Sequence, residues 1–170
     1  MTTREQIYYT FMPSPVGKFL VAGTERVLHR TAFSESEQFT LEADWIEDAA
    51  PLKYATDQLE AYFEGKLTEF DVELAMMGSE FQVAVWQALM DVPYGKTASY
   101  GDIAHALGKP GASRAVGGAN NSNHIPIVIP CHRIIGADGS MTGFGGGMEN
   151  KKILLKLEGI SVPSEQLDLF

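Results

Sequence analysis

Alternation of apolar and polar residues marks the first part of the chain. The segments IYYTFM (7–12), KFLVAG (18–23) and RVLHRTAF (26–33) are rich in aromatic and β-branched residues, and they are separated by residues typical of turns. Consecutive strands joined by short turns pair in antiparallel order. We therefore expect a small antiparallel meander over residues 7–33.

A helix is predicted after this meander. Residues 34–48 are acidic and lack a clear period, which predicts a loop or a short helix. Between Pro51 and Gly65 the apolar residues recur at intervals of three and four, as on one face of a helix: Leu52, Ala55, Leu59, Tyr62 and Phe63. The run FDVEL (70–74) then returns to the alternation of a strand.

From Ser79 onward the pattern is one of helices and loops. Ser79 is predicted to cap a helix whose apolar face holds Phe81, Val85, Trp86 and Leu89. Thr97 or Ser99 is predicted to cap a second helix, YGDIAHALG (100–108), and Ser113 a third one that begins with Arg114. Two short helices joined by a tight turn are typical of a helix-turn-helix. A last helix is predicted over ENKKILLKLEG (149–159).

The fold class that follows is α+β. We expect a small strand-rich α/β N-terminal lobe at 1–78, a helical lobe with a helix-turn-helix and the active site at 79–160, and a C-terminal tail at 161–170. The 170 residues, 45% of them hydrophobic, are enough for a real core. No apolar stretch approaches the roughly 18 residues of a membrane span, and the first residues lack the features of a signal peptide. We expect a cytoplasmic monomer with no membrane partner.

The distribution of charge changes the expectation for nucleic acid. A net charge of −9 argues against DNA binding, but residues 1–95 hold 6 Lys and Arg against 16 Asp and Glu, whereas residues 96–156 hold 7 against 3. Only the segment 96–156 is suited to face phosphates. Its small positive balance predicts a modest affinity that salt weakens.

The chemistry centres on Cys131, the one cysteine of the chain. A single cysteine forms no internal disulfide, and its spacing from the four histidines fits no metal site, so we expect neither a metal nor a cofactor. The apolar run IPIVIP (125–130) predicts a buried, strand-like segment that delivers the thiol beside His132. A neighbouring base or positive charge raises the thiolate fraction at neutral pH. The alternative is an inert core cysteine, because cysteine is among the most buried residue types.

A set of separated motifs supports the reactive alternative. PCHRII (130–135) is preceded by SRAVGGA (113–119) and NHIPIVI (123–129), and it is followed by TGFGGG (142–147) and KLEG (156–159). In this order the motifs resemble the O6-alkylguanine-DNA alkyltransferase family. The resemblance covers roughly residues 79–160, while the N-terminal lobe matches only in its strand-rich outline.

The resemblance implies a DNA repair reaction. Cys131 would attack the alkyl carbon of O6-alkylguanine, with O4-alkylthymine as an alternative substrate, and become S-alkylcysteine in one irreversible turnover. His132 matches the general base that takes the thiol proton through a water, and Glu158 matches the carboxylate that orients this imidazole. Asn123 matches the residue that braces the turn carrying the site. Arg133 is assigned no chemical step.

The resemblance also implies how damaged DNA is held. Arg114 matches a finger that fills the gap left by the flipped nucleotide, and the small residues behind it suit the minor groove of double-stranded DNA. Tyr100 matches a phenol that donates to guanine N3. The Gly145 N–H would face O6, and the carbonyls of Ile134 and Cys131 would accept from the guanine amine. Phe144 stands where many relatives have Tyr, and Asn120 and Asn121 replace residues that are apolar or basic in relatives.

Three other functions compete with this interpretation. The first is a non-catalytic, alkylated-DNA-binding helix-turn-helix protein, but such relatives of the alkyltransferases usually replace the cysteine. The second is a helix-turn-helix regulator, which would leave the thiol beside His132 without a purpose. The third is a thiol protease, for which the sequence lacks a recognisable oxyanion hole.

The tail Gln166–Phe170 carries a separate motif, which resembles the peptide by which bacterial proteins bind the replication sliding clamp. The alternative for this tail is that its apolar residues pack on the protein's own surface.

Overall fold

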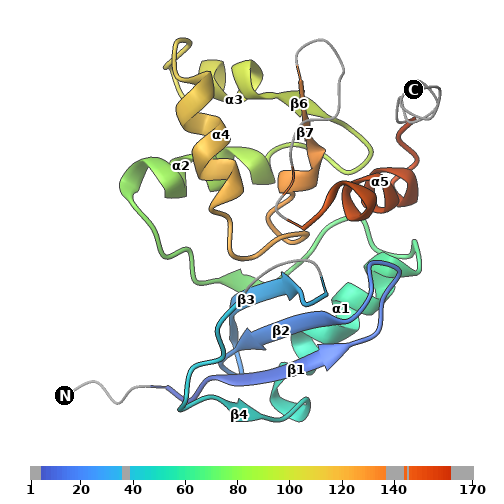
Figure 1. Ribbon diagram of the computed structural model, residues 1–170. Coiled ribbons are helices and arrows are strands. Elements are labelled where there is room, and N and C mark those ends of the chain that lie inside the picture. Colours follow the sequence, from blue (N-terminus) through green and yellow to red (C-terminus); the bar gives the residue numbers. More distant parts are fainter. Residues whose placement is uncertain (1–4, 36–38, 137–143, 145, 162–170) are drawn as a thin grey trace. The chain divides into compact units, whose positions relative to one another are not determined.

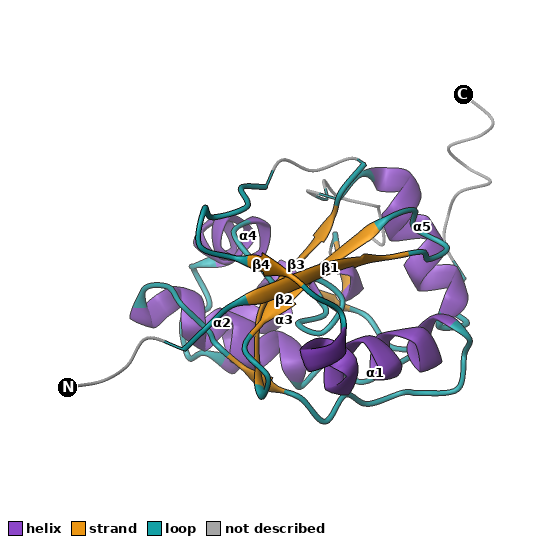
Figure 2. Ribbon diagram, turned by 90° about the horizontal axis from the view of Figure 1, so that it is seen from below, coloured by secondary structure: helices purple, strands orange, loops and turns teal. Residues whose placement is uncertain are grey.

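The chain forms two compact units, Met1–Ala75 and Met76–Phe170. We describe them separately from a computed structural model that covers residues 5–35, 39–136, 144 and 146–161 (Figure 1). The first unit contains most of the strands and the second most of the helices (Figure 2). The predicted α+β class is confirmed.

The first unit is built on a five-stranded sheet with the order β4-β1-β2-β3-β5. Its centre is the predicted meander, formed by the antiparallel strands β1 (Tyr8–Met12), β2 (Phe19–Gly23) and β3 (Val27–Phe33). The edge strands β4 (Ile46–Glu47) and β5 (Glu73–Leu74) run parallel to their neighbours. For β4 the prediction of a loop or short helix was wrong, because the Ile46 and Asp48 N–H groups donate to carbonyls of the first strand segment.

One helix packs on this sheet. The 3-10 turn η1 (Ala50–Leu52) leads into α1 (Lys53–Phe63), as the spacing of apolar residues predicted. The Phe19 ring lies 5.4 Å from that of Phe33 and 5.9 Å from that of Phe63, which joins the helix to the strands. Gly65 ends the helical segment with a φ of 75°, a conformation that glycine adopts without strain.

The second unit holds the remaining helices. They are α2 (Glu80–Met90), α3 (Tyr100–Ala106), α4 (Ser113–Asn121) and α5 (Met148–Leu157), with the 3-10 turn η2 (Cys131–Arg133). Two short strands, β6 (Ala98–Ser99) and β7 (Ile134–Ile135), pair in parallel. No helix in the described part of the chain is long and apolar enough to cross a membrane.

Capping decides where these helices begin. Ser79 caps α2 and Ser99 caps α3, each in a reciprocal capping box with the residue three positions later. The prediction that Ser113 caps α4 was wrong. Ser113 is itself the first helical residue, and Ala112 stands at the N-cap without any side-chain hydrogen bond. The alanine at the N-cap has no side-chain oxygen to accept from the free N–H groups of the first turn.

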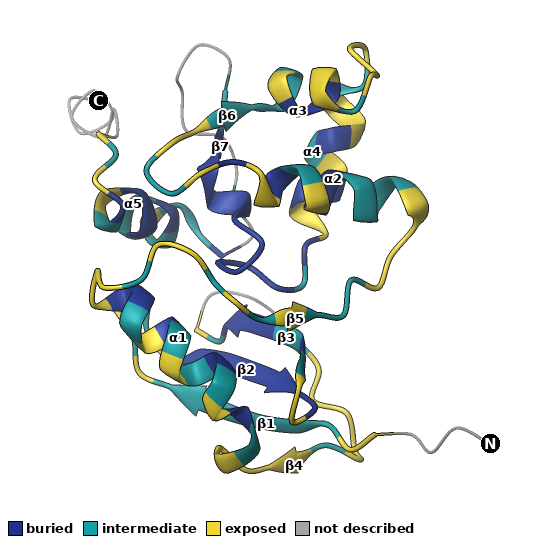
Figure 3. Ribbon diagram, turned by 180° about the vertical axis from the view of Figure 1, so that it is seen from behind, coloured by how far each residue is buried: buried dark blue, intermediate teal, exposed yellow. Residues whose placement is uncertain are grey.

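The apolar run before Cys131 is buried, as expected, but it is not a strand (Figure 3). Pro126 and Pro130 lack the N–H groups that a ladder needs, so the backbone turns instead. Ile127 adopts a φ of 77°, and the Ile129 N–H donates to the Ile125 carbonyl at 2.9 Å. The prediction of a strand-like segment was therefore wrong, and a tight buried loop presents the thiol.

Candidate active site

The candidate nucleophile lies at the start of η2. Cys131 forms no disulfide and has 5% of its surface exposed, and its N–H donates to the Ile129 carbonyl at 2.8 Å. A 3-10 turn rotates the chain by about 120° per residue, so the side chains of Cys131, His132 and Arg133 leave it in three directions. The turn thus delivers a buried thiol while its neighbours reach other elements.

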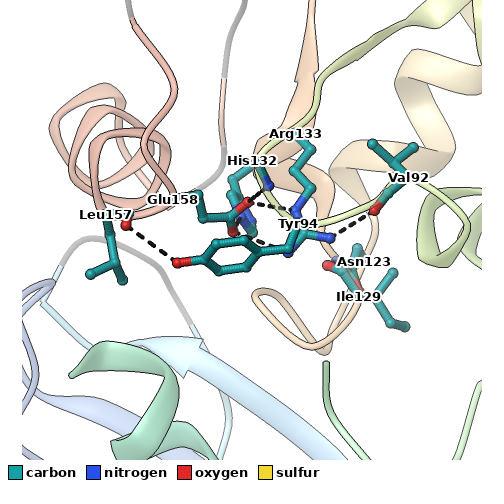
Figure 4. A network of polar contacts seen from close by, with 9 residues as sticks. Val92, Tyr94, Asn123, Ile129, His132, Arg133, Leu157 and Glu158 are labelled. Carbon is teal, nitrogen blue, oxygen red and sulfur yellow. Dashed lines mark hydrogen bonds and ion pairs between the residues drawn. The ribbon is translucent and has the colours of Figure 1, made fainter. Parts of the chain in front are cut away.

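Glu158 collects these neighbours from the C-cap of α5. Its carboxylate is fully buried, and it accepts from His132 Nε2 at 2.6 Å and from Arg133 Nε and Nη2 at 2.8 and 3.1 Å (Figure 4). The Gly95 N–H donates to it at 3.1 Å. Each carboxylate oxygen therefore accepts two hydrogen bonds, which stabilises a buried negative charge.

This arrangement sets the state of His132. Burial lowers the pKa of its imidazole below the ordinary value, although the hydrogen bond and charge of Glu158 act in the opposite direction. The positive charges of Arg133 and Lys151 lower the pKa further. At neutral pH the ring is neutral and its Nε2–H donates to Glu158, which leaves Nδ1 with the lone pair that a base needs.

Arg133 links three segments of the unit. Besides its two bonds to Glu158, it donates from Nη1 to the Val92 carbonyl at 2.7 Å, and its guanidinium lies 5.8 Å from the centre of the Tyr94 ring. The Tyr94 hydroxyl donates to the Leu157 carbonyl at 3.3 Å. These contacts make Arg133 a structural ion-pair partner that ties the end of α5 to η2.

Asn123 closes the loop that precedes the thiol. Its Nδ2 donates to the Ile129 carbonyl at 2.9 Å, both residues being drawn in Figure 4. Its Oδ1 accepts from the Ile125 N–H at 2.9 Å. Both bonds are buried. They replace the ladder bonds that the two prolines prevent, and so they hold the backbone that leads into Cys131.

Lys151 is a residue of this site that sequence reasoning missed. It is fully buried on α5, and its Nζ donates to the Ile134 carbonyl at 2.5 Å and lies 5.9 Å from the centre of the Phe144 ring. Burial lowers its pKa to about 8, and the charge of Cys131 opposes this shift. Its position was a usable signal, because Lys151 falls on the apolar face of α5 with Leu154 and Leu155.

The residues expected to bind DNA lie on α3 and α4. Tyr100 opens α3, is half-buried, and its ring lies so close to α4 that a Cβ at Gly117 would meet it at 3.7 Å. Arg114 is exposed on the first turn of α4. Ile134 is buried, and Gly145 lies outside the described residues. Asn120 is only 3% exposed and so packs inward, whereas Asn121 is exposed.

The residues that come together are those from η2, the loop before it, the start of β7, and α5 with its C-cap: Asn123, Cys131, His132, Arg133, Ile134, Lys151 and Glu158. In the described part of the chain, no three His, Cys, Asp or Glu side chains are grouped to hold a metal ion. A thiol, a neutral imidazole and a buried carboxylate in this order can generate a thiolate and use it as a nucleophile.

Comparison with known proteins identifies relatives of both units. Sequence profiles described as the ribonuclease-like domain and the DNA binding domain of 6-O-methylguanine DNA methyltransferase match residues 7–76 and 80–160. A methylated-DNA–protein-cysteine methyltransferase of Mycobacterium bovis is 48% identical over 164 residues, which are 96% of this chain and 99% of the relative. One from Methanosarcina barkeri is 50% identical over 153 residues, 89% of this chain and 97% of that one. The crystal structure of Mycobacterium tuberculosis OGT in complex with DNA superposes with a TM-score of 0.86 at 47% identity, covering 93% of this chain and 96% of that chain.

Proposed function

Since the chain belongs to the 6-O-methylguanine DNA methyltransferase family, we propose that Cys131 is the residue to which it transfers the alkyl group. The activity is DNA repair, by transfer of an alkyl group from methylated DNA to a cysteine of the protein. The alternative of a non-catalytic DNA-binding protein is not favoured. The residue roles that follow are our proposal for how this chain performs the reaction.

The reaction begins with ionisation of the thiol. His132 takes the Cys131 proton through a water, and Glu158 stabilises the imidazolium that forms. The thiolate sulfur then attacks the alkyl carbon as the bond from that carbon to guanine O6 breaks, and its electron pair leaves with guanine, which takes up a proton. The product is a thioether, which is a poor leaving group, so each chain reacts once.

The observation that carries this proposal is the buried 2.6 Å contact between His132 and Glu158, next in the chain to the buried, reduced thiol of Cys131. The test is intact-mass measurement after mixing the full chain with DNA that contains O6-methylguanine. We expect a gain of one methyl group on Cys131 and no further gain with excess DNA. The matched Cys131→Ser variant should gain no mass and still bind DNA, because phosphate contacts dominate affinity. Transfer by this variant at a rate near that of the native chain would refute the role of Cys131.

For DNA binding we propose that α3 and α4 form a helix-turn-helix in a helical lobe at 79–160, preceded by a strand-rich lobe at 1–78. Support comes from their contact and from the Ala and Gly residues of α4, which allow a helix to approach the minor groove closely. We assign to Arg114 the role of entering the stack when the target base flips out, and its exposure on the first turn of α4 supports this role.

Guanine recognition is proposed for three further groups. The Tyr100 phenol donates to N3, the Ile134 carbonyl accepts from the exocyclic amine, and the Gly145 N–H stabilises O6 as guanine leaves. The Ile134 carbonyl already accepts from Lys151, and a carbonyl oxygen has a second lone pair for the amine. O4-alkylthymine is an alternative substrate, and transfer from DNA that contains it, measured by the same mass gain, tests it.

A partner is proposed for the tail 161–170, of which residues 162–170 lie outside the described residues. Gln166, Leu167, Asp168, Leu169 and Phe170 resemble a sliding-clamp binding peptide, with apolar side chains suited to a partner's groove. Clamp binding would raise the local concentration of this acidic protein at replicating DNA. Deleting residues 166–170 should abolish binding to purified bacterial clamp and leave methyl transfer intact. Clamp binding that is unchanged by the deletion would refute the proposal.

We also propose that the protein is a cytoplasmic monomer, and light scattering of the purified chain tests its mass in solution.

A further inference from the structure

We propose that Lys151 is a positioning residue of alkyl transfer, whose buried ammonium stabilises the thiolate form of Cys131. The inference rests on the proposed role of Cys131 as the nucleophile. Lys151 touches neither the alkyl group nor guanine in this proposal, and it acts through the charge of the sulfur.

The geometry places the ammonium beside the nucleophile's own segment. α5 packs on η2, and the side chain of Lys151 crosses to donate to the carbonyl of Ile134, three residues after Cys131. The residue is fully buried, so its charge acts through protein rather than through water. The ring of Phe144 covers it at 5.9 Å.

Burial of this lysine is unfavourable for folding. Its pKa falls to about 8 because water is removed from the ammonium, and the free energy of unfolding is lower at neutral pH than it would be with an apolar residue of similar size. The one opposing contribution is the negative charge of Cys131, which raises the pKa of Lys151. The stabilisation is mutual, so the same ammonium favours the thiolate.

Lys151 acts on the base as well. Its charge lowers the pKa of His132, which keeps the imidazole neutral and able to accept a proton. Among the described residues, the other charged groups facing the thiol segment are Arg133 on the same turn and Glu158 at the C-cap of α5, and they pair with each other. Glu149 and Lys156 of α5 and Glu80 of α2 are exposed, and Lys152 pairs with Glu149 at the surface. Lys151 is therefore a buried positive charge on α5 that forms no ion pair with Glu158.

The test measures the thiolate directly and needs no DNA. The rate at which iodoacetamide alkylates Cys131 is followed by intact mass in the full chain from pH 4 to pH 9, and the midpoint of this profile reports ionisation of the thiol. In Lys151→Met we expect the midpoint to rise by at least about 1 pH unit, since a nearby opposite charge shifts a pKa by about 1–3 units. At a pH below both midpoints, a rise of this size means that the variant holds at least about tenfold less thiolate than the native chain.

Two matched variants separate charge from packing. Lys151→Arg keeps the charge and should keep a midpoint near that of the native chain, whereas Lys152→Met removes the neighbouring, partly exposed lysine of the same helix and should leave the midpoint unchanged. A folded Lys151→Met chain with the native midpoint, or a shift of equal size in Lys152→Met, would overturn the proposal. A shifted midpoint together with absent methyl transfer by the native chain would refute the proposed function and a role of Lys151 in alkyl transfer, while still showing that Lys151 stabilises the thiolate.

A second measurement uses the native chain and does not depend on a variant that folds. The pKa of Lys151 is followed by NMR of its labelled Nζ before and after Cys131 is methylated. Methylation removes the negative charge of the sulfur, so the pKa of Lys151 should fall. An unchanged pKa would show that the two groups do not interact, and the proposal would then be wrong.

Discussion

Replacing Glu158 by Gln tests the buried network most severely. The substitution keeps the shape of the side chain and removes the negative charge that accepts from His132, Arg133 and the Gly95 N–H. The guanidinium of Arg133, only 7% exposed at its side chain, then lacks its counter-ion. Breaking a buried pair by removing one partner costs about 3–5 kcal/mol, and the remaining Gln oxygen still accepts, so we expect a loss of about 3 kcal/mol.

Urea unfolding measures this loss. Trp86 is buried in α2 and Trp45 lies in the first unit, so a Trp45→Phe background lets the fluorescence of Trp86 report on the second unit alone. The control is Glu149→Gln on the same helix, because the Glu149 side chain is 85% exposed and its contact with Lys152 is 3.6 Å long. Exposed pairs of this kind contribute about 0–1 kcal/mol.

A double variant separates the ion pair from other effects. In Glu158→Gln with Arg133→Met the unpaired guanidinium is gone, so the combined loss should be smaller than the sum of the single losses by at least about 1 kcal/mol. A loss below about 1 kcal/mol for Glu158→Gln, or losses that simply add, would refute the view that this carboxylate stabilises the unit through Arg133.

Three further outcomes follow from the site. Asn123→Ala removes two buried hydrogen bonds, so it should lower the free energy of unfolding by about 2–3 kcal/mol and slow methyl transfer. The control Asn121→Ala, at an exposed position, should change neither quantity. Equal losses of the two variants in urea unfolding would contradict the bracing role of Asn123. The pKa of His132 is below its ordinary 6.5 in the folded chain, so as the pH falls below 6.5 the unfolded chain binds a proton first and stability is lost. Unfolding at pH 7.5 and pH 5.5 should show a smaller loss in His132→Gln than in the native chain, and identical losses would exclude this histidine as the cause. Arg114→Ala should slow the reaction on duplex DNA far more than on free O6-alkylguanine, which needs no flipping, and an equal slowing of both would exclude a finger.

The sequence alone determined the helices and the central strands of the sheet. The three strands of the meander, the helix after Pro51 and the capped helices at Ser79 and Ser99 depend on interactions between residues a few positions apart, which periodicity and capping chemistry report directly. The contiguous residues Cys131 and His132, with the motifs around them, were sufficient to indicate an activated thiol. Local pattern failed at IPIVIP, because two prolines prevent a strand that its apolar residues favour, and at Ser113, where the helix begins one residue earlier than its capping chemistry predicted.

The tertiary structure decided which distant charges meet at the thiol. Glu149 and Glu158 both lie at ends of α5, and the family resemblance singled out Glu158, but only the packing of that helix on η2 brings its carboxylate within 2.6 Å of an imidazole 26 residues earlier. The same packing buries Lys151 and exposes Lys156, two lysines that a composition count treats alike. The free energy of a charge depends on how much water surrounds it and on which charges lie within a few ångströms, and both are set by contacts between segments that the order of residues does not reveal.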